Sequence, residues 1–61
     1  MKARDLIKQM EDAGWVEVRQ KGSHRIFQHP DFPRSIPVPD HGAKDLSKGT
    51  AHAILKQAGL R

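Results

Sequence analysis

Residues 15–29, which read WVEVRQKGSHRIFQH, decide the fold of this chain. Two runs of alternating, partly β-branched residues flank Gly22-Ser23, and a glycine in the first position is typical of a two-residue type II′ turn. We therefore predict a β-hairpin with strands over 15–21 and 24–29. A two-residue turn also fixes the strand register. The predicted cross-strand pairs are Lys21 with His24, Gln20 with Arg25, Arg19 with Ile26, Val18 with Phe27, Glu17 with Gln28, and Val16 with His29.

Alternation along a strand sorts these side chains onto two faces of the hairpin. We assign Val16, Val18 and Phe27 to the core face. The other face is then mostly polar and open to solvent. Its predicted members are Glu17, Arg19, Lys21, His24 and Ile26.

A helix is predicted on each side of this hairpin, because apolar residues recur there at helical spacing. In the first helix they are Ala3, Leu6, Ile7, Met10 and Ala13, and Gly14 stands where a C′ glycine ends a helix. Ser47 can cap the second helix and Gly59 can end it. Its apolar face consists of Ala51, Ile54, Leu55 and Ala58, bracketed by Leu46 and Leu60.

A third short strand is predicted at residues 35–39, which read SIPVP, between loops at 30–34 and 40–45. Pro37 and Pro39 cannot donate to a strand ladder, so this strand must lie at an edge of the sheet or pair on one side only. The predicted order is α-β-β-β-α in a single α+β domain over residues 1–61. Both helices are one-sided, so we expect them on one face of a three-stranded antiparallel sheet.

The chain has 61 residues, no cysteine and a net charge of +4. Without cysteine there are no disulfides and no thiolate metal ligands, which fits a cytoplasmic protein. No apolar run approaches the roughly 18 residues of a transmembrane helix, and charged residues interrupt any signal-peptide core. The positive charge favours a polyanionic partner, with RNA or DNA first. A basic surface without such a partner explains the charge equally well.

His24 is the first candidate for chemistry. The register places it exposed, directly after the turn, with Lys21 across the ladder and Arg19 further along the same face. An imidazole exchanges protons near neutral pH, and the cations could hold a phosphodiester beside it. A base next to a bound phosphate is the minimum for RNA cleavage, because the ribose 2′-OH is an internal nucleophile. The alternative is an ordinary surface histidine in a hairpin.

Lys48, His52 and Lys56 follow at i, i+4 and i+8 and form a basic stripe on the second helix. The helix N-terminus beside Gly49 offers free N–H groups to a phosphate, but a solvated polar face explains the stripe as well. Four scattered histidines without cysteine or an H-E-x-x-H motif do not indicate a metal site. We expect neither a metal nor another cofactor.

The chain resembles the HicA-type toxins, the small mRNA interferases of HicA–HicB toxin–antitoxin modules. The resemblance runs from Lys2 to Leu60. The residues that carry it are Gly14-Trp15, 19–24 (RQKGSH), His29-Pro30, Val38-Pro39, 45–50 (DLSKGT) and 54–60 (ILKQAGL). One departure is Ser47, where relatives often carry proline before Lys-Gly-Thr, and either residue can begin a helix.

This resemblance implies a fold like that of double-stranded-RNA-binding domains and an endoribonuclease that cuts mRNA. It also implies inhibition by a HicB-type antitoxin that covers the active face. The toxin is expected to be monomeric alone and hetero-oligomeric with its antitoxin. The catalytic histidine of the family maps onto His24. The residues expected to bind RNA are Arg19, Lys21, Gly22, Ser23, Arg25, Lys48 and Lys56.

Two other functions fit the same residues. A non-catalytic RNA-binding module would use His24 only as a phosphate contact. A protein-interaction domain would present its basic surface to an acidic partner and would have no affinity for RNA. Roles for His29 and His41 do not follow from the resemblance.

Overall fold

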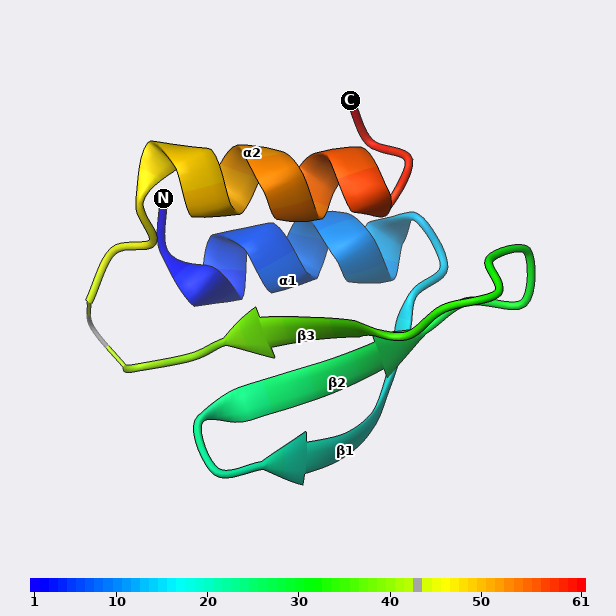
Figure 1. Cartoon of the computed structure of the whole chain (residues 1–61), viewed down its shortest axis with the longest axis horizontal. Helices are drawn as coiled ribbons and strands as arrows, with labels where there is room; N and C mark the ends of the chain where they lie inside the picture. Colours follow the sequence, from blue (N-terminus) through cyan, green and yellow to red (C-terminus); the bar gives the residue numbers. More distant parts are fainter. Residues whose placement is uncertain (43) are drawn as a thin grey trace.

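Two helices and one three-stranded antiparallel sheet follow each other in the order α-β-β-β-α (Figure 1). The elements are α1 (Ala3–Asp12), β1 (Val16–Lys21), β2 (His24–Gln28), β3 (Ile36–Pro39) and α2 (Lys48–Gln57). The computed structural model describes residues 1–42 and 44–61, so Ala43 in the predicted loop 40–45 lies outside the described residues. No helix within these ranges is long and apolar enough to cross a membrane. The predicted class and element order are confirmed.

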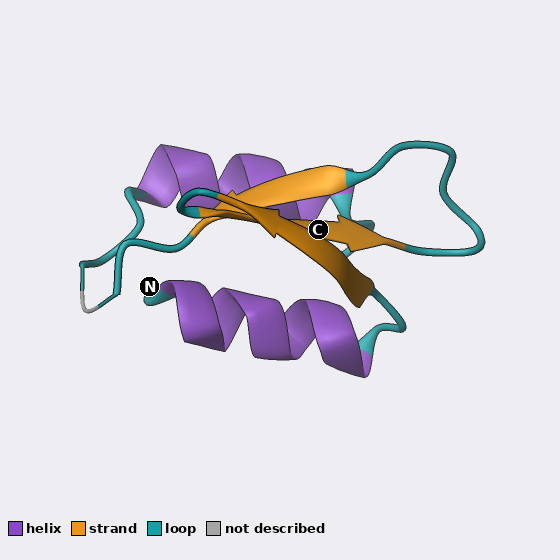
Figure 2. Ribbon diagram, turned by 90° about the horizontal axis from the view of Figure 1, so that it is seen from below, coloured by secondary structure: helices purple, strands orange, loops and turns teal. Residues whose placement is uncertain are grey.

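Both helices cover the same face of the sheet. Figure 1 shows α1 and α2 side by side, and Figure 2 shows α1 apart from the strands as a separate layer. One cluster of buried side chains joins the three components: Leu6, Ile7 and Met10 of α1, Ile54 and Leu55 of α2, and Phe27, Ile36 and Val38 of the sheet. The predicted helical core faces are therefore confirmed. The opposite face of the sheet, which we call the open face, has no helix over it.

Each helix ends where its C′ glycine was predicted, and the backbone explains why. After α1, the Gly14 N–H donates to the Glu11 carbonyl and the Trp15 N–H to the Met10 carbonyl. Gly59 and Leu60 repeat this pattern after α2. These are Schellman motifs, which need a residue with positive φ at C′. The φ angles are +100° at Gly14 and +78° at Gly59.

The start of α2 also matches its prediction. The Ser47 Oγ accepts a hydrogen bond from the Thr50 N–H at 3.2 Å. This bond satisfies one of the backbone donors that the first turn of a helix leaves without an intrahelical partner. The capping serine therefore fixes where α2 begins, directly before Lys48 and Gly49.

The hairpin register is as predicted near the turn and differs beyond it. Lys21 pairs with His24, Gln20 with Arg25, and Arg19 with Ile26. The ladder then shifts, because Val18 is an extra residue in β1 and Glu17 pairs with Phe27. Such a β-bulge places one additional residue on one strand and changes the faces of those that follow.

Because of the bulge, the predicted core positions of Val16 and Val18 are wrong. Val16 now pairs with Gln28, and its exposed fraction is 59%, while that of Val18 is 48%. Only Phe27 of the three predicted hairpin core residues is buried, at 0% exposure. Glu17 moves in the opposite direction, from the predicted open face to the helix-covered face beside Phe27. The cause is the extra residue in β1, which a strict two-residue alternation of faces does not predict.

The third strand lies at the edge of the sheet, as its prolines required. The Asp40 N–H donates to the Ser23 carbonyl at 2.7 Å, which makes the adjacent His24–Pro39 pair a non-hydrogen-bonded pair. Pro37 stands two residues earlier in the same kind of position. Both proline nitrogens therefore face away from β2, and the β2–β3 ladder is complete without them.

We expect Gly14→Ala to destabilise the fold. A left-handed conformation costs a non-glycine residue roughly 1–2 kcal/mol. The added Cβ would also lie 2.8 Å from the His29 Nε2 atom. The thermal midpoint should fall by at least about 8 °C, measured by circular dichroism.

Gly49→Ala is the matched control, because a Cβ at Gly49 meets no atom within 4 Å. Alanine is favoured over glycine in a helix, so its midpoint should stay the same or rise. Equal losses in both variants would contradict the role of Gly14.

Candidate functional site

His24 is the first residue of β2 and its side chain is exposed on the open face. Its cross-strand neighbours are Lys21 on one side and Pro39 on the other. Gly22 has a φ of +60° and Ser23 has a negative φ, which matches the predicted type II′ turn. Within the described part of the chain, no side chain forms a hydrogen bond or ion pair with the His24 imidazole, so it is available to a ligand.

The open face around His24 is cationic. Arg19 pairs with Ile26, which puts its side chain on the same face as Lys21 and His24. Ile26 is 9% exposed and forms an apolar floor between these polar groups. Glu17 is the one carboxylate in the three strands, and it lies on the helix-covered face. The strands therefore present Arg19, Lys21 and His24 without an acidic side chain among them.

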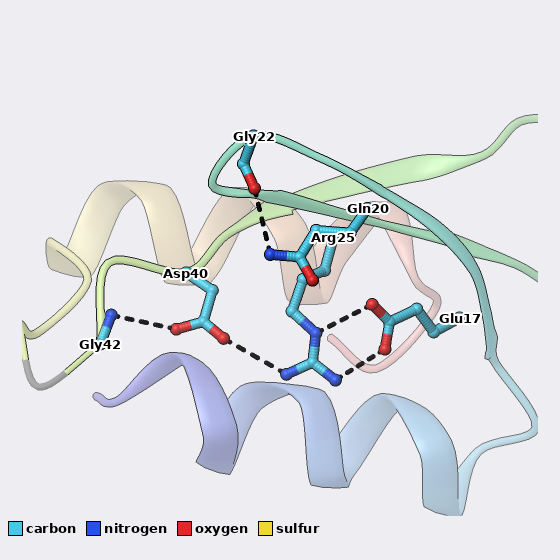
Figure 3. A network of polar contacts seen from close by, with 6 residues as sticks. All are labelled: Glu17, Gln20, Gly22, Arg25, Asp40 and Gly42. Carbon is cyan, nitrogen blue, oxygen red and sulfur yellow. Dashed lines mark hydrogen bonds and ion pairs between the residues drawn. The ribbon is translucent and has the colours of Figure 1, made fainter.

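Arg25 lies on the helix-covered face, where two carboxylates hold its guanidinium (Figure 3). It donates to both carboxylate oxygens of Glu17, at 3.0 and 2.6 Å, and to Asp40 Oδ2 at 3.3 Å. Its guanidinium carbon lies 5.9 Å from the centre of the Phe27 ring. These contacts tie β1 and β2 to the residue that follows β3.

The three charged side chains are only 27–28% exposed, so solvent screens them less than it screens a surface pair. The hydrogen bonds from Arg25 hold the pKa of Glu17 below its ordinary value of 4.5. The hydrogen bond to Glu17, together with that to Asp40, raises the pKa of Arg25 above its ordinary value. Glu17 and Arg25 are therefore ionised at neutral pH, and we call the network of Glu17, Arg25 and Asp40 the clamp.

The predicted role of Arg25 as a phosphate ligand stays a prediction, and its present contacts weigh against it. Its side chain is on the face opposite Arg19 and Lys21, and its guanidinium already binds two carboxylates. The sequence contained a signal for this, since alternation puts Arg25 on the same face as Phe27. An arginine on a face that is partly buried needs counter-ions. The identity of those counter-ions depended on the bulge and on the end of β3, which the pattern did not show.

The turn residues Gly22 and Ser23 lie next to His24 as predicted. The Gly22 carbonyl accepts a hydrogen bond from Gln20 Nε2 at 3.0 Å, and the Ser23 carbonyl accepts from the Asp40 N–H. A Cβ on Gly22 would meet no atom within 4 Å. The turn is thus held through its carbonyl oxygens and is sterically open, and its phosphate contact stays a prediction.

The basic stripe of α2 is exposed, as predicted, but it belongs to the helix layer. Lys48 begins α2 at the end of the molecule that also holds the β1–β2 turn (Figure 1). Lys56 lies about 12 Å further along the helix axis, toward the other end. A surface cavity beside the first turns of α2 is lined by Met1, Lys48, Gly49, Ala51, His52, Leu55 and Arg61. The structure therefore places Lys48 nearer to the His24 end than Lys56.

His29 is structural. Its Nε2 lies 3.0 Å from the Ala13 carbonyl, and its Nδ1 accepts a hydrogen bond from the Asp31 N–H at 3.0 Å. The ring also packs against Trp15 and Phe32. It lies away from His24, against rings that belong to or pack on the core. His41 is exposed in the loop after β3.

No cluster of three or more histidine, aspartate or glutamate side chains in residues 1–42 and 44–61 is arranged to hold a metal ion. Independence from metals stays a prediction.

All three aromatic side chains of the chain lie in or against the core. Trp15 is 2% exposed and its Nε1 donates to the Ala58 carbonyl at 3.2 Å. Phe27 is fully buried, and Phe32 packs on Trp15 with ring centroids 4.9 Å apart. Trp15 therefore covers part of the core. The strands of the open face therefore offer cations to a phosphate, but no tryptophan, tyrosine or phenylalanine ring to a base.

Comparison with known proteins agrees with the resemblance seen in the sequence. The family model described as HicA toxin of bacterial toxin-antitoxin matches residues 3–60. A protein of Pseudomonas fluorescens (strain Pf0-1) named probable mRNA interferase HicA is 44% identical over 41 residues. That match covers 67% of this chain and 65% of the relative, so the chain spans slightly less than two thirds of the relative's length.

We expect the clamp to make the stability of the fold depend on pH, and Glu17→Gln tests this. Because the pKa of Glu17 is lowered in the folded state, its contribution is fully present above 4.5, its ordinary value. The contribution is lost as the pH falls through the lower folded pKa. The variant should be less stable at neutral pH. On acidification below about pH 4.5, the thermal midpoint of the parent should fall more steeply than that of the variant. Parallel curves would contradict this assignment.

Proposed function

The chain belongs to the HicA toxin family, and on this premise we propose that it is the toxin of a toxin–antitoxin pair. Its activity would be that of an endoribonuclease, carried by one domain over residues 1–61, that cuts mRNA with His24 as the acid–base group. The observation that supports this most directly is the placement of His24. It is exposed beside Arg19 and Lys21 on the open face, and the one carboxylate of the strands, Glu17, lies on the other face.

This arrangement suits cleavage of RNA through its own 2′-OH. His24 accepts the proton of the 2′-OH, and the O2′–phosphorus bond forms. The bond from phosphorus to the 5′-oxygen breaks, and that oxygen takes a proton from water. The products are a 2′,3′-cyclic phosphate and a 5′-hydroxyl end. Lys21 and Arg19 stabilise the negative charge that develops on the phosphate oxygens. None of these steps uses a metal ion or another cofactor.

RNA would bind mainly through its phosphates. Arg19 and Lys21 contact the scissile region, the Gly22-Ser23 turn lies against the backbone, and Lys48 and Lys56 guide the strand further away. Arg25 is not a member of this set, because Glu17 and Asp40 occupy its guanidinium. Because Trp15, Phe27 and Phe32 lie in or against the core, base stacking contributes little, and the electrostatic term dominates affinity.

A HicB-type antitoxin would neutralise the toxin by covering the open face. That face has the exposed His24 and Val16, and Val18 is exposed at the bulge, so a protein can bury both catalytic and apolar surface there. The free toxin would then be a monomer, and the inhibited form a hetero-oligomer. Because its substrate is mRNA, we infer that it acts in the cytoplasm.

We expect His24→Ala to abolish cleavage. Loss of a general base lowers the rate by about 100-fold or more. The side chain is exposed and makes no hydrogen bond to another described residue, so the thermal midpoint should not change. Growth after induced expression, cleavage of a labelled RNA and the ends of its products should be measured for parent and variant.

His41→Ala, which removes another exposed histidine, is the control and should keep parental activity. Cleavage by folded His24→Ala protein would refute the role of His24. Products with 5′-phosphate ends would exclude attack by the 2′-OH. RNA binding without any cleavage by the parent would instead indicate a non-catalytic RNA-binding module.

Lys21→Gln should weaken RNA binding uniformly across sequences. Loss of one phosphate contact should reduce the slope of log K against log salt by about 0.7 for single-stranded RNA. Lys8→Gln, an exposed position on α1 with the same change in charge, should leave the slope unchanged. The measurement is fluorescence anisotropy over a range of salt concentrations. Equal slopes for both variants would place the RNA elsewhere.

A further inference from the structure

The residue after β3, Asp40, contacts both neighbours of His24 in the chain. Its N–H donates to the carbonyl of Ser23, the turn residue before β2, at 2.7 Å. Its carboxylate Oδ2 accepts from Arg25 Nη1 at 3.3 Å. Asp40 therefore forms one hydrogen bond with the residue before His24 and one with the residue after it. We call these two hydrogen bonds the bracket.

Asp40 is itself fixed from two directions. Its Oδ1 accepts a hydrogen bond from the Gly42 N–H at 3.2 Å, which closes an Asx-type turn directly after β3 (Figure 3). The Arg25 that it binds is held on its other side by both oxygens of Glu17. The bracket thus connects β1, β2 and the end of β3, and its orientation does not depend on one flexible side chain.

The bracket and the imidazole lie on opposite faces of the sheet. Successive side chains of a strand alternate, so Arg25 points toward the helices while His24 points to the open face. Asp40 can therefore restrain the backbone on both sides of His24 without contacting the ring or blocking a ligand. His24 is the first residue of a strand and directly follows a two-residue turn. Strand ends fray, so without the bracket we expect the backbone at His24 to be more mobile.

We propose that Asp40 is a positioning residue for His24. Through Ser23 and Arg25 it holds the backbone of residue 24 at one orientation, so that the imidazole stays beside Lys21 and the bound phosphate. This inference rests on the proposed function for its catalytic consequence, but not for its effect on the order of the His24 ring. A displacement of about 1 Å in a catalytic group can cost roughly 100-fold in rate.

Asp40→Asn tests this role, because it keeps the backbone N–H and an oxygen for Gly42 while removing the charge that binds Arg25. With a short RNA substrate, well below the thermal midpoint, kcat should fall about tenfold and KM should change by less than about twofold. Asp40→Glu, which restores a carboxylate, should recover a substantial part of the lost kcat. Asp45→Asn is the matched control, since Asp45 pairs with Lys2 at 3.2 Å and touches neither Ser23 nor Arg25.

A second readout is independent of activity. In Asp40→Asn the His24 ring should become more mobile, seen as a lower order parameter in ¹³C relaxation of the imidazole, while Asp45→Asn should leave it unchanged. A merely structural role for Asp40 would lower the thermal midpoint but change neither kcat of the folded protein nor the ring order.

The outcomes separate the two proposals. If His24→Ala is inactive and Asp40→Asn has parental kcat and ring order, the positioning role is overturned and the proposed function stands. If His24→Ala retains cleavage, the proposed function fails, and the ring order alone then decides whether Asp40 positions His24.

Discussion

The bulge at Val18 is the constraint on which the division of charge in this protein depends. It moves Glu17 from the open face to the helix-covered face, opposite Phe27. There the carboxylate binds Arg25 through two hydrogen bonds. Without the extra residue, strict alternation would leave Glu17 among Arg19 and Lys21, where it would repel a phosphate and attract their side chains. One inserted residue therefore keeps the Glu17 carboxylate with its half-buried partner Arg25 and leaves the open face cationic.

The same network gives mechanical support to the hairpin tip. A chain of 61 residues has a small core, and its cluster extends over Phe27, Ile36 and Val38 but not to the turn. Buried apolar contacts cannot hold the segment around His24, because that side chain is exposed. Beyond the end of the core, the hydrogen bonds of Arg25 with Glu17 and Asp40 hold this segment instead. They are charge-assisted, directional and partly shielded from solvent. The site thus combines an accessible imidazole with a restrained backbone.

Features with short-range causes were predictable from sequence. The C′ glycines Gly14 and Gly59, the Ser47 cap and the Gly22-Ser23 turn each depend on neighbouring backbone groups. The register was right for three pairs from the turn and wrong beyond them, because errors in strand pairing arise where the period is broken. The exposure of His24 and the position of Lys21 across from it fell within the correct part. The positions of Val16 and Val18 did not, and the register alone did not show which carboxylates bind Arg25.

The sequence by itself determined the element order, the helix ends, the edge position of β3 and the cationic surroundings of His24. Periodicity, capping and the φ preferences of glycine and proline act within a few residues, so they can be seen in the chain. Only the tertiary structure decided that Glu17 and Asp40 meet Arg25, and that Asp40 brackets His24. These contacts join three segments far apart in sequence. Their geometry depends on the bulge in β1 and on the end of β3, and the two-residue period of the strands shows neither.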